Sequence, residues 1–355
     1  MTLETQFQDA KKLLGQLIAC PSLSREEDGT ASIIEGFFRS KGIPTHRLHH
    51  NVWATNLLFD PSKPSILLNS HHDTVKPNPS WSVDPWTATE IDGKLMGLGS
   101  NDAGASLVCL ISTFCHFYEA KLPFNLVIAA TGEEEISGTQ GIESLLNAKD
   151  FPEISWAIIG EPTDCQLAIA EKGLMVIDAV STGKSGHAAR EEGVNAIDLA
   201  MEDILKIKAF EFPKISSLLG RVKTTVTVIN AGKQHNVIPA ICEFTIDCRV
   251  NECYTLDEVL KILQDVVKAE LKPRSMRLKP SKIEGQHPIV QAAVKLGIPT
   301  FGSPTLSDQA LLACPSVKIG PGHSGRSHTA DEYILLDELK QGIQTYQTLI
   351  EQLNS

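Results

Sequence analysis

The stretch PSILLNSHHDT, residues 64–74, decides the fold that the sequence predicts. It begins as an apolar run of strand length and ends in a polar cluster. The same order recurs in FNLVIAATGEEE (124–135) and ISWAIIGEPTD (154–164), and a helical pattern over 103–119 lies between the first two. Apolar strands that alternate with helices are typical of a mostly parallel sheet flanked by helices, which binds ligands at the carboxyl ends of its strands. We therefore expect an α/β fold whose polar clusters form one site.

A second, smaller domain is predicted from Gly173 onward. The pattern there becomes strand, helix, two strands, helix and strand, the βαββαβ order of a ferredoxin-like α+β domain. These elements are expected at 174–183, 194–210, 222–232, 240–250, 255–271 and 275–283. The apolar segment 316–322 then suggests a return to the first sheet. We expect residues 1–172 and 282–355 to form the larger domain, with residues 173–281 inserted into it.

Composition and charge exclude several classes of protein. Lys and Arg number 32 against 43 Asp and Glu, and the net charge of −11 argues against a nucleic-acid partner. The first 20 residues indicate an amphipathic helix rather than a signal peptide, and no run approaches the ~18 apolar residues of a membrane span. The eight cysteines lack a C-x-x-C pair, which favours reduced thiols. We expect a cytoplasmic protein with no membrane partner.

Motifs for nucleotide and serine chemistry are incomplete. GLGSNDAG (97–104) has Asp102 where a dinucleotide fingerprint needs its third glycine. GKS (183–185) lacks the first glycine of a P-loop, because that position is Asp178. GHSG (322–325) is one residue short of a nucleophile elbow. Nucleotide binding and serine hydrolysis are therefore not predicted.

Carboxylates and histidines at the strand ends remain. His71 and Asp73 face the same way on an extended segment, so Asp73 could orient a ligating His71, although a polar turn explains them equally well. Asp102 could cap the helix at 103–119, or bridge two metal ions about 3.5–4 Å apart.

Three consecutive glutamates, Glu133–Glu135, directly follow an apolar strand. Crowded acids repel one another there unless cations or raised pKa values relieve them, whereas a solvated charge run is the simpler alternative. Glu161 could equally cap a loop, and His328 alone could be a surface histidine. Each residue is a weak signal, and their order along the chain is a stronger one.

The order of SHHD, GSNDAG, TGEEEISGTQG, GEPT, SGHAA, HNVIP, DCR and GRSHTADEY resembles that of a co-catalytic zinc family. This family includes acetylornithine deacetylase, succinyl-diaminopimelate desuccinylase, aminoacylase and glutamate carboxypeptidases. The resemblance spans nearly the whole chain and implies two divalent metal ions, zinc or else cobalt or manganese. Asp102 would bridge the two ions, with the other ligands being His71 and Glu161 on one, and Glu135 and His328 on the other.

The resemblance also implies the catalytic groups. Glu134 would be the general base that takes a proton from a metal-bound water, and Asp73 would orient His71. Three carboxylates against two dications leave one positive charge, which favours a bound hydroxide. His187 would reach the active site of a partner subunit and steady the oxyanion, in a homodimer formed through the inserted lid and dimerisation domain.

Further residues would bind substrate. Asn236 and Arg249 would hold an α-carboxylate, and the backbone at Gly320 and Gly322 would approach the substrate closely. Arg326 is a further candidate, for a second carboxylate such as a succinyl tail.

The chain departs from the family pattern at two places. Asp102 is followed by Ala-Gly-Ala where many relatives have Met-Lys-Gly, so a lysine near the metals is missing. Glu133 stands where relatives commonly carry Asp, which leaves the register within Glu133–Glu135 open by one residue. The downstream ISGTQG favours Glu134 as the base.

The function implied by the resemblance is hydrolysis of the amide bond of an N-acyl-L-amino acid, namely N-acetyl- or N-succinyl-L-ornithine in arginine biosynthesis. One alternative within the family is a di- or tripeptide exopeptidase or a succinyl-diaminopimelate desuccinylase. An alternative of another class is a non-catalytic scaffold or binding module. That alternative predicts that a metal ligand or the general base is missing. In this chain, all five ligand positions and the base position carry the expected residues.

Overall fold

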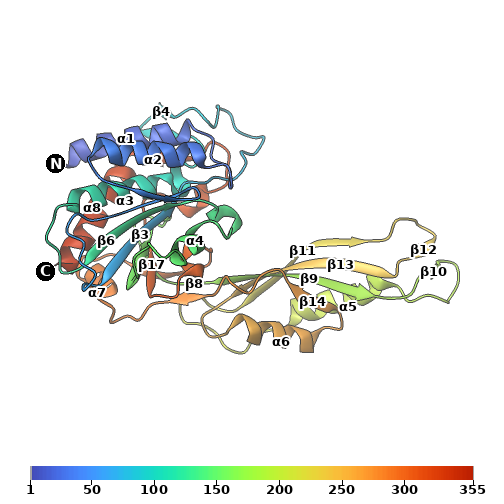
Figure 1. The fold of residues 1–355 in the computed structure, drawn as a ribbon. Coiled ribbons are helices and arrows are strands. Elements are labelled where there is room, and N and C mark those ends of the chain that lie inside the picture. Colours follow the sequence, from blue (N-terminus) through green and yellow to red (C-terminus); the bar gives the residue numbers. More distant parts are fainter. Residues whose placement is uncertain (1, 355) are drawn as a thin grey trace. The chain divides into compact units, whose positions relative to one another are not determined.

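The computed structural model describes residues 2–354, which form two compact units (Figure 1). The first unit comprises residues 2–169, Ile283–Phe301 and residues 307–354. The second comprises Ala170–Lys282 and Gly302–Leu306. The second unit is therefore enclosed in sequence by the first.

The central sheet of the first unit is mainly parallel, as predicted. Its inner strands lie in the order β6 (Asn125–Thr131), β3 (Ser65–His71), β7 (Trp156–Ile159) and β17 (Ser316–Lys318), and neighbours pair in parallel. The flanking strands pair antiparallel: β2 (Asn51–Thr55) on β6, β1 (His46–Leu48) on β2, and β8 (Leu167–Glu171) on β17. The strands predicted in the apolar parts of 64–74, 124–135 and 154–164 are confirmed, as is the predicted return to this sheet after the insertion.

Both faces of this sheet are covered, which explains why its strands are almost continuously apolar. Successive residues of a strand point to opposite faces, so Ile66 and Leu68 join one core cluster while Leu67 joins another. The first cluster receives buried side chains from α1 (Leu3–Ile18), α2 (Asp28–Ser40), α3 (Ala105–Phe117), α7 (Pro288–Lys295) and α8 (Leu336–Leu353). The second receives Ile142 and Leu145 of α4 (Ile142–Leu146).

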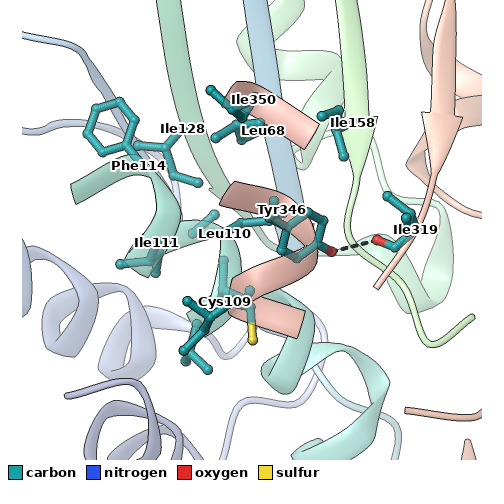
Figure 2. Packing of buried hydrophobic residues seen from close by; sticks show 14 of the residues in the cluster. Leu68, Cys109, Leu110, Ile111, Phe114, Ile128, Ile158, Ile319, Tyr346 and Ile350 are labelled. Atoms are coloured by element: carbon teal, nitrogen blue, oxygen red, sulfur yellow. Dashed lines mark hydrogen bonds between the residues drawn. The ribbon is translucent and has the colours of Figure 1, made fainter. Parts of the chain in front are cut away.

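The larger cluster fixes the C-terminal helix against the sheet (Figure 2). Tyr346 of α8 is buried beside Leu110 of α3, and its hydroxyl donates a hydrogen bond of 2.5 Å to the carbonyl oxygen of Ile319. Ile319 directly follows β17, so this bond positions the chain just before it enters the loop at Gly320.

A small three-stranded sheet brings two distant segments together. β5 (Lys94–Met96) pairs with β4 (Thr89–Ile91) on one side and with β18 (Tyr333–Leu335) on the other. Because β5 precedes Asp102 and β18 follows His328, the pairing places the segments that carry these two residues next to each other.

The second unit has the predicted βαββαβ order. Its strands β9 (Gly173–Thr182), β11 (Lys223–Ala231), β13 (Ile241–Val250) and β14 (Glu270–Pro273) form an antiparallel sheet in the order β11-β13-β9-β14. Helices α5 (Ala196–Ala209) and α6 (Leu256–Val266) bury their apolar sides in one cluster with the inward side chains of this sheet. A short pair, β10 (Gly186–His187) and β12 (Val237–Ile238), extends from it.

Two boundaries in the second unit differ from the prediction. The helix expected at 255–271 ends at Val266, and the last strand is Glu270–Pro273 rather than 275–283. The buried carboxylate of Asp203 on α5 accepts the backbone N–H groups of Lys268 and Ala269, which turns the chain out of the helix and into β14. From the segment 275–283, Ser281–Lys282 forms β15 and pairs with β8.

The eight cysteines are free thiols rather than disulfides. Among residues 2–354, every helix is too short or too polar to cross a bilayer.

The hydroxyl of Tyr346 offers a test of the packing at β17. We expect Tyr346→Phe to lower the free energy of unfolding of the first unit by about 1–2 kcal/mol, because the buried carbonyl of Ile319 loses its hydrogen bond. Tyr118→Phe is the matched control, since the described residues provide no hydrogen bond to the half-buried Tyr118 hydroxyl. Denaturant unfolding followed by fluorescence measures both, and equal stability of the two variants would contradict the assignment.

Candidate metal centre

The carboxyl ends of the parallel strands bring the predicted polar clusters to one edge of the sheet. His71 is the last residue of β3 and lies opposite Thr131, the last residue of β6. Glu134 and Glu135 begin the short 3₁₀ helix η2 (Glu134–Ile136) just after β6, and Glu161 follows β7. Parallel neighbours that end at the same level therefore place these side chains together.

Asp102 and His328 come from less regular segments. Asp102 lies in the turn η1 (Ser100–Gly104) that leads into α3, and it precedes a cis peptide bond to Ala103. His328 follows the 3₁₀ helix η4 (Ser324–Arg326) and has a positive φ of 60°. The small sheet formed by β5 and β18 holds both segments at the same edge.

Three carboxylates approach the Nε2 atom of His71, a residue that is 1% exposed. Its Nε2 lies 3.4 Å from Asp102 Oδ1, 3.7 Å from Glu161 Oε1 and 4.0 Å from Glu134 Oε2. An imidazole nitrogen and carboxylate oxygens that converge in this way are common ligands of zinc and similar divalent ions.

A second histidine lies on the other side of Asp102. His328 Nε2 is 2.9 Å from Glu135 Oε2 and 3.5 Å from Asp102 Oδ2. The two oxygens of Asp102 therefore face different histidines, the arrangement expected of a carboxylate shared by two cations.

The acids of this cluster have strongly perturbed protonation. Burial raises the pKa of Glu134 well above its usual value and raises the pKa of Glu161 to about 8, with the neighbouring carboxylates adding to both shifts. The hydrogen bond to Glu135 raises the pKa of His328 to about 9. Burial disfavours the charged form of His71, but hydrogen bonds to Asp102 and other carboxylates outweigh it and raise its pKa well above the usual value.

Divalent cations suit this donor set. His71, Asp102 and Glu135 each offer a ligand atom within 4.8 Å of the others. The acids repel one another in a buried place, and protons relieve that repulsion when no cation is bound. Metal ions would do the same with a larger charge, so the residues present fit the metals that the sequence implies.

Asp73 supports several members of the cluster at once. His71 Nδ1 is 3.0 Å from the backbone oxygen of Asp73 and 3.4 Å from its Oδ1, so the main chain is the nearer partner. The Asp73 carboxylate accepts the backbone N–H groups of Glu134 at 3.1 Å and Glu135 at 3.2 Å, and a hydroxyl hydrogen bond from Ser24 at 2.7 Å. Asp73 therefore orients the glutamate turn as well as the histidine.

Glu133 turns away from the two histidines. Its carboxylate accepts the backbone N–H of Gln140 at 3.2 Å, and its own N–H donates to the buried carboxylate of Glu27 at 3.0 Å. The hydrogen bonds of Glu133 thus lie outside the cluster, whereas Glu134 faces His71 and Glu135 faces His328.

Sequence reasoning missed three buried acids near the site. Glu332 accepts backbone N–H groups from the turn that carries Asp102, and Asp308 accepts hydrogen bonds from Asn69 at 2.8 Å and Thr131 at 2.9 Å. Glu27 is the third, through Glu133. The available signal for Glu332 was its place four residues after His328 in the GRSHTADEY motif.

The predicted substrate-binding glycines fill tight positions in the first unit. A Cβ atom on Gly320 would lie 2.2 Å from Ser106 Oγ, and one on Gly322, whose φ is +83°, would lie 2.3 Å from Asn101 Oδ1. Arg326 is already engaged: its guanidinium contacts both carboxylate oxygens of Glu338, at 2.6 and 3.0 Å. Contact of these residues with a substrate stays a prediction.

The remaining predicted residues lie in the second unit. His187 pairs with Val237 across β10 and β12 and is exposed, as is Asn236, whose carbonyl accepts the N–H of Ala188. Arg249 forms two hydrogen bonds with Asp247, at 2.9 and 3.1 Å. The roles proposed for His187, Asn236 and Arg249 stay predictions.

Comparison with known proteins agrees with this architecture. The family described as Peptidase family M20/M25/M40 matches residues 67–352. The acetylornithine deacetylase of Proteus mirabilis (strain HI4320) is 30% identical over 365 residues, which cover 91% of each chain. A tripeptidase from Staphylococcus aureus has a similar structure, with a TM-score of 0.79, 20% identity and 98% of both chains covered. A dinuclear metal binding peptidase of the M20 family from Bacillus subtilis gives a TM-score of 0.75, 18% identity and the same coverage.

Metal binding should depend on pH in a defined direction. At pH 6 the groups with raised pKa, Glu161 and His328, hold protons that a metal ion must displace. We expect chelator-treated protein to bind Zn²⁺ more tightly as the pH rises from 6 to 8, and to release protons on binding. Calorimetry in buffers of different ionisation enthalpy measures both quantities.

Asp102→Ala is the comparison, because it removes the carboxylate that faces both histidines and should abolish tight binding at either pH. Zinc affinity that does not change with pH, or that survives in Asp102→Ala, would contradict the candidate metal centre.

Proposed function

Because the chain belongs to peptidase family M20/M25/M40, we propose that it is a dinuclear zinc hydrolase that cleaves the amide bond of an N-acyl-L-amino acid. The observation that carries this proposal is the Asp102 carboxylate between His71 and His328, with Glu134, Glu135 and Glu161 around it.

Each residue of the cluster has a proposed part in holding the metals. Asp102 would bridge the two ions, with His71 and Glu161 on one side and Glu135 and His328 on the other. Bound divalent ions supply Lewis acidity, which polarises the acyl carbonyl and acidifies water. Asp73 keeps His71, Glu134 and Glu135 in place through the hydrogen bonds described above.

Glu134 is the proposed general base. Its carboxylate lies beside His71, and its backbone N–H is held by Asp73, so the carboxylate has a fixed position in the cluster. Glu134 takes a proton from the attacking water and delivers it to the leaving amine nitrogen, which balances the hydrolysis. His187 of a partner subunit is proposed to steady the oxyanion, and Asn236 and Arg249 to bind the α-carboxylate, in a cytoplasmic homodimer.

The proposed substrate is N-acetyl- or N-succinyl-L-ornithine, in arginine biosynthesis. Support for it comes from the relative named acetylornithine deacetylase, which is 30% identical over most of its length. A di- or tripeptide exopeptidase is the second candidate, because the matched family is described as a peptidase family. Both activities use the same metals and differ in the groups that surround the scissile amide.

A substrate panel distinguishes the two candidates. We expect purified, zinc-loaded protein to release ornithine from N-acetyl- or N-succinyl-L-ornithine with a higher kcat/KM than for any di- or tripeptide. Liquid chromatography of the free amino acids measures the release. Cleavage of peptides without release of ornithine would select the exopeptidase, and a zinc-loaded protein inactive on the whole panel would argue against both.

The neighbouring glutamates provide a matched pair of variants for the general base. We expect Glu134→Gln to lower kcat about 10²- to 10⁴-fold while zinc content is retained, because the proton acceptor is lost. Glu133→Gln makes the same chemical change one residue earlier, where the carboxylate binds Gln140, and should keep most of the activity. Zinc content is measured by atomic emission in parallel, and a larger loss of kcat in Glu133→Gln would show that the roles are reversed.

A further inference from the structure

Glu332 is a buried acid that touches the turn of Asp102 rather than the histidines. The residue is 2% exposed. Its Oε1 accepts the backbone N–H groups of Asn101 and Asp102, both at 2.8 Å, and its Oε2 accepts the N–H of Gly99 at 3.0 Å. Three backbone N–H groups of this turn therefore converge on one buried carboxyl group, which holds the turn in place.

The position of Glu332 follows from the small sheet. Met96 of β5 pairs with Tyr333 of β18, and the next hydrogen bond along this ladder runs from Gly97 N–H to the carbonyl oxygen of Glu332 at 3.0 Å. The main chain of Glu332 thus ends the ladder, and its side chain continues the contact into the turn that carries Asp102. His328 lies four residues earlier on the same segment.

Asn101 provides a second connection between these two segments. Its Oδ1 accepts the N–H of His323 at 3.0 Å, and its Nδ2 donates to the carbonyl oxygen of His323 at 3.2 Å. Together, Asn101 and Glu332 fix the turn of Asp102 to the segment 323–332, which carries His328.

We propose that Glu332 is a positioning residue that holds Asp102 so that its two carboxylate oxygens can serve two different metal ions. Asp102 Oδ1 faces His71 at 3.4 Å and Oδ2 faces His328 at 3.5 Å. A metal site tolerates errors of only about 0.2 Å in its ligand distances, so rotation of this turn would misplace one oxygen or the other. The inference rests on the metal centre proposed above.

A purely structural role for Glu332 makes a different prediction. A buried carboxylate that accepts backbone N–H groups stabilises a turn wherever it occurs, as Asp203 does for Lys268 and Ala269 in the second unit. Loss of such a group lowers thermal stability. Only a positioning role also lowers metal affinity and changes the geometry of the bound metal.

The experiment compares Glu332→Gln with Asp203→Asn, its matched control in the second unit. A glutamine has one acceptor oxygen, so at least one N–H of the Asp102 turn would face the amide N–H₂ group. Chelator-treated proteins are titrated with Zn²⁺ by calorimetry and with Co²⁺ by visible absorption, and their thermal midpoints are recorded. We expect Glu332→Gln to weaken metal binding about 10- to 100-fold and to alter the Co²⁺ spectrum. Asp203→Asn should lower the thermal midpoint and leave affinity and spectrum unchanged.

Two outcomes would overturn the inference. The first is a Glu332→Gln protein that binds two metal ions with wild-type affinity and spectrum, whatever its thermal midpoint. If that variant does not fold, Glu332→Asp decides instead, because it keeps the carboxyl group on a side chain one methylene shorter. Wild-type metal affinity in Glu332→Asp is the second overturning outcome. If the wild-type protein binds no metal, the proposed metal centre itself is wrong. That result is distinguishable from a failure of the inference about Glu332 alone, in which the wild-type protein still binds metal.

Discussion

The concentration of negative charge at one edge of a buried sheet is the constraint on which the rest of this structure depends. The largely buried carboxylates of Asp102, Glu134, Glu135 and Glu161 converge on the buried His71 and the half-exposed His328. Such an arrangement is costly unless positive charge or protons enter it. Hydrogen bonds fix the turns that carry three of these acids. Asp73 accepts the backbone N–H groups of Glu134 and Glu135, and Glu332 accepts that of Asp102.

Three buried acids hold the two turns that carry Asp102, Glu134 and Glu135. Asp73 holds the turn after β6, Glu27 holds the same turn through Glu133, and Glu332 holds the turn before α3. These hydrogen bonds within the protein contribute to the placement of the candidate metal ligands.

Sequence patterns predicted the parts of the molecule that depend on local or repeated signals. Continuous apolar runs identified β3, β6 and β7 because both faces of the sheet are covered, and the order of the motifs identified the family. Glu332 escaped notice because an acid that accepts buried N–H groups looks, in sequence, like any solvated acid. The predicted end of α6 was wrong for a related reason. Asp203, on another helix, ends α6 at Val266 through a contact that no local pattern records.

The two-sided covering of the central sheet has a consequence for biosynthesis. The apolar face that holds Ile66, Leu68 and Ile128 is covered by α1 and α3, which precede the second unit in the sequence, and by α8, which follows it. The second unit, by contrast, is built almost entirely from one uninterrupted stretch, Ala170–Lys282. Most of the second unit, Ala170–Lys282, is therefore synthesised before β17 and α8, which the sheet and the core of the first unit require.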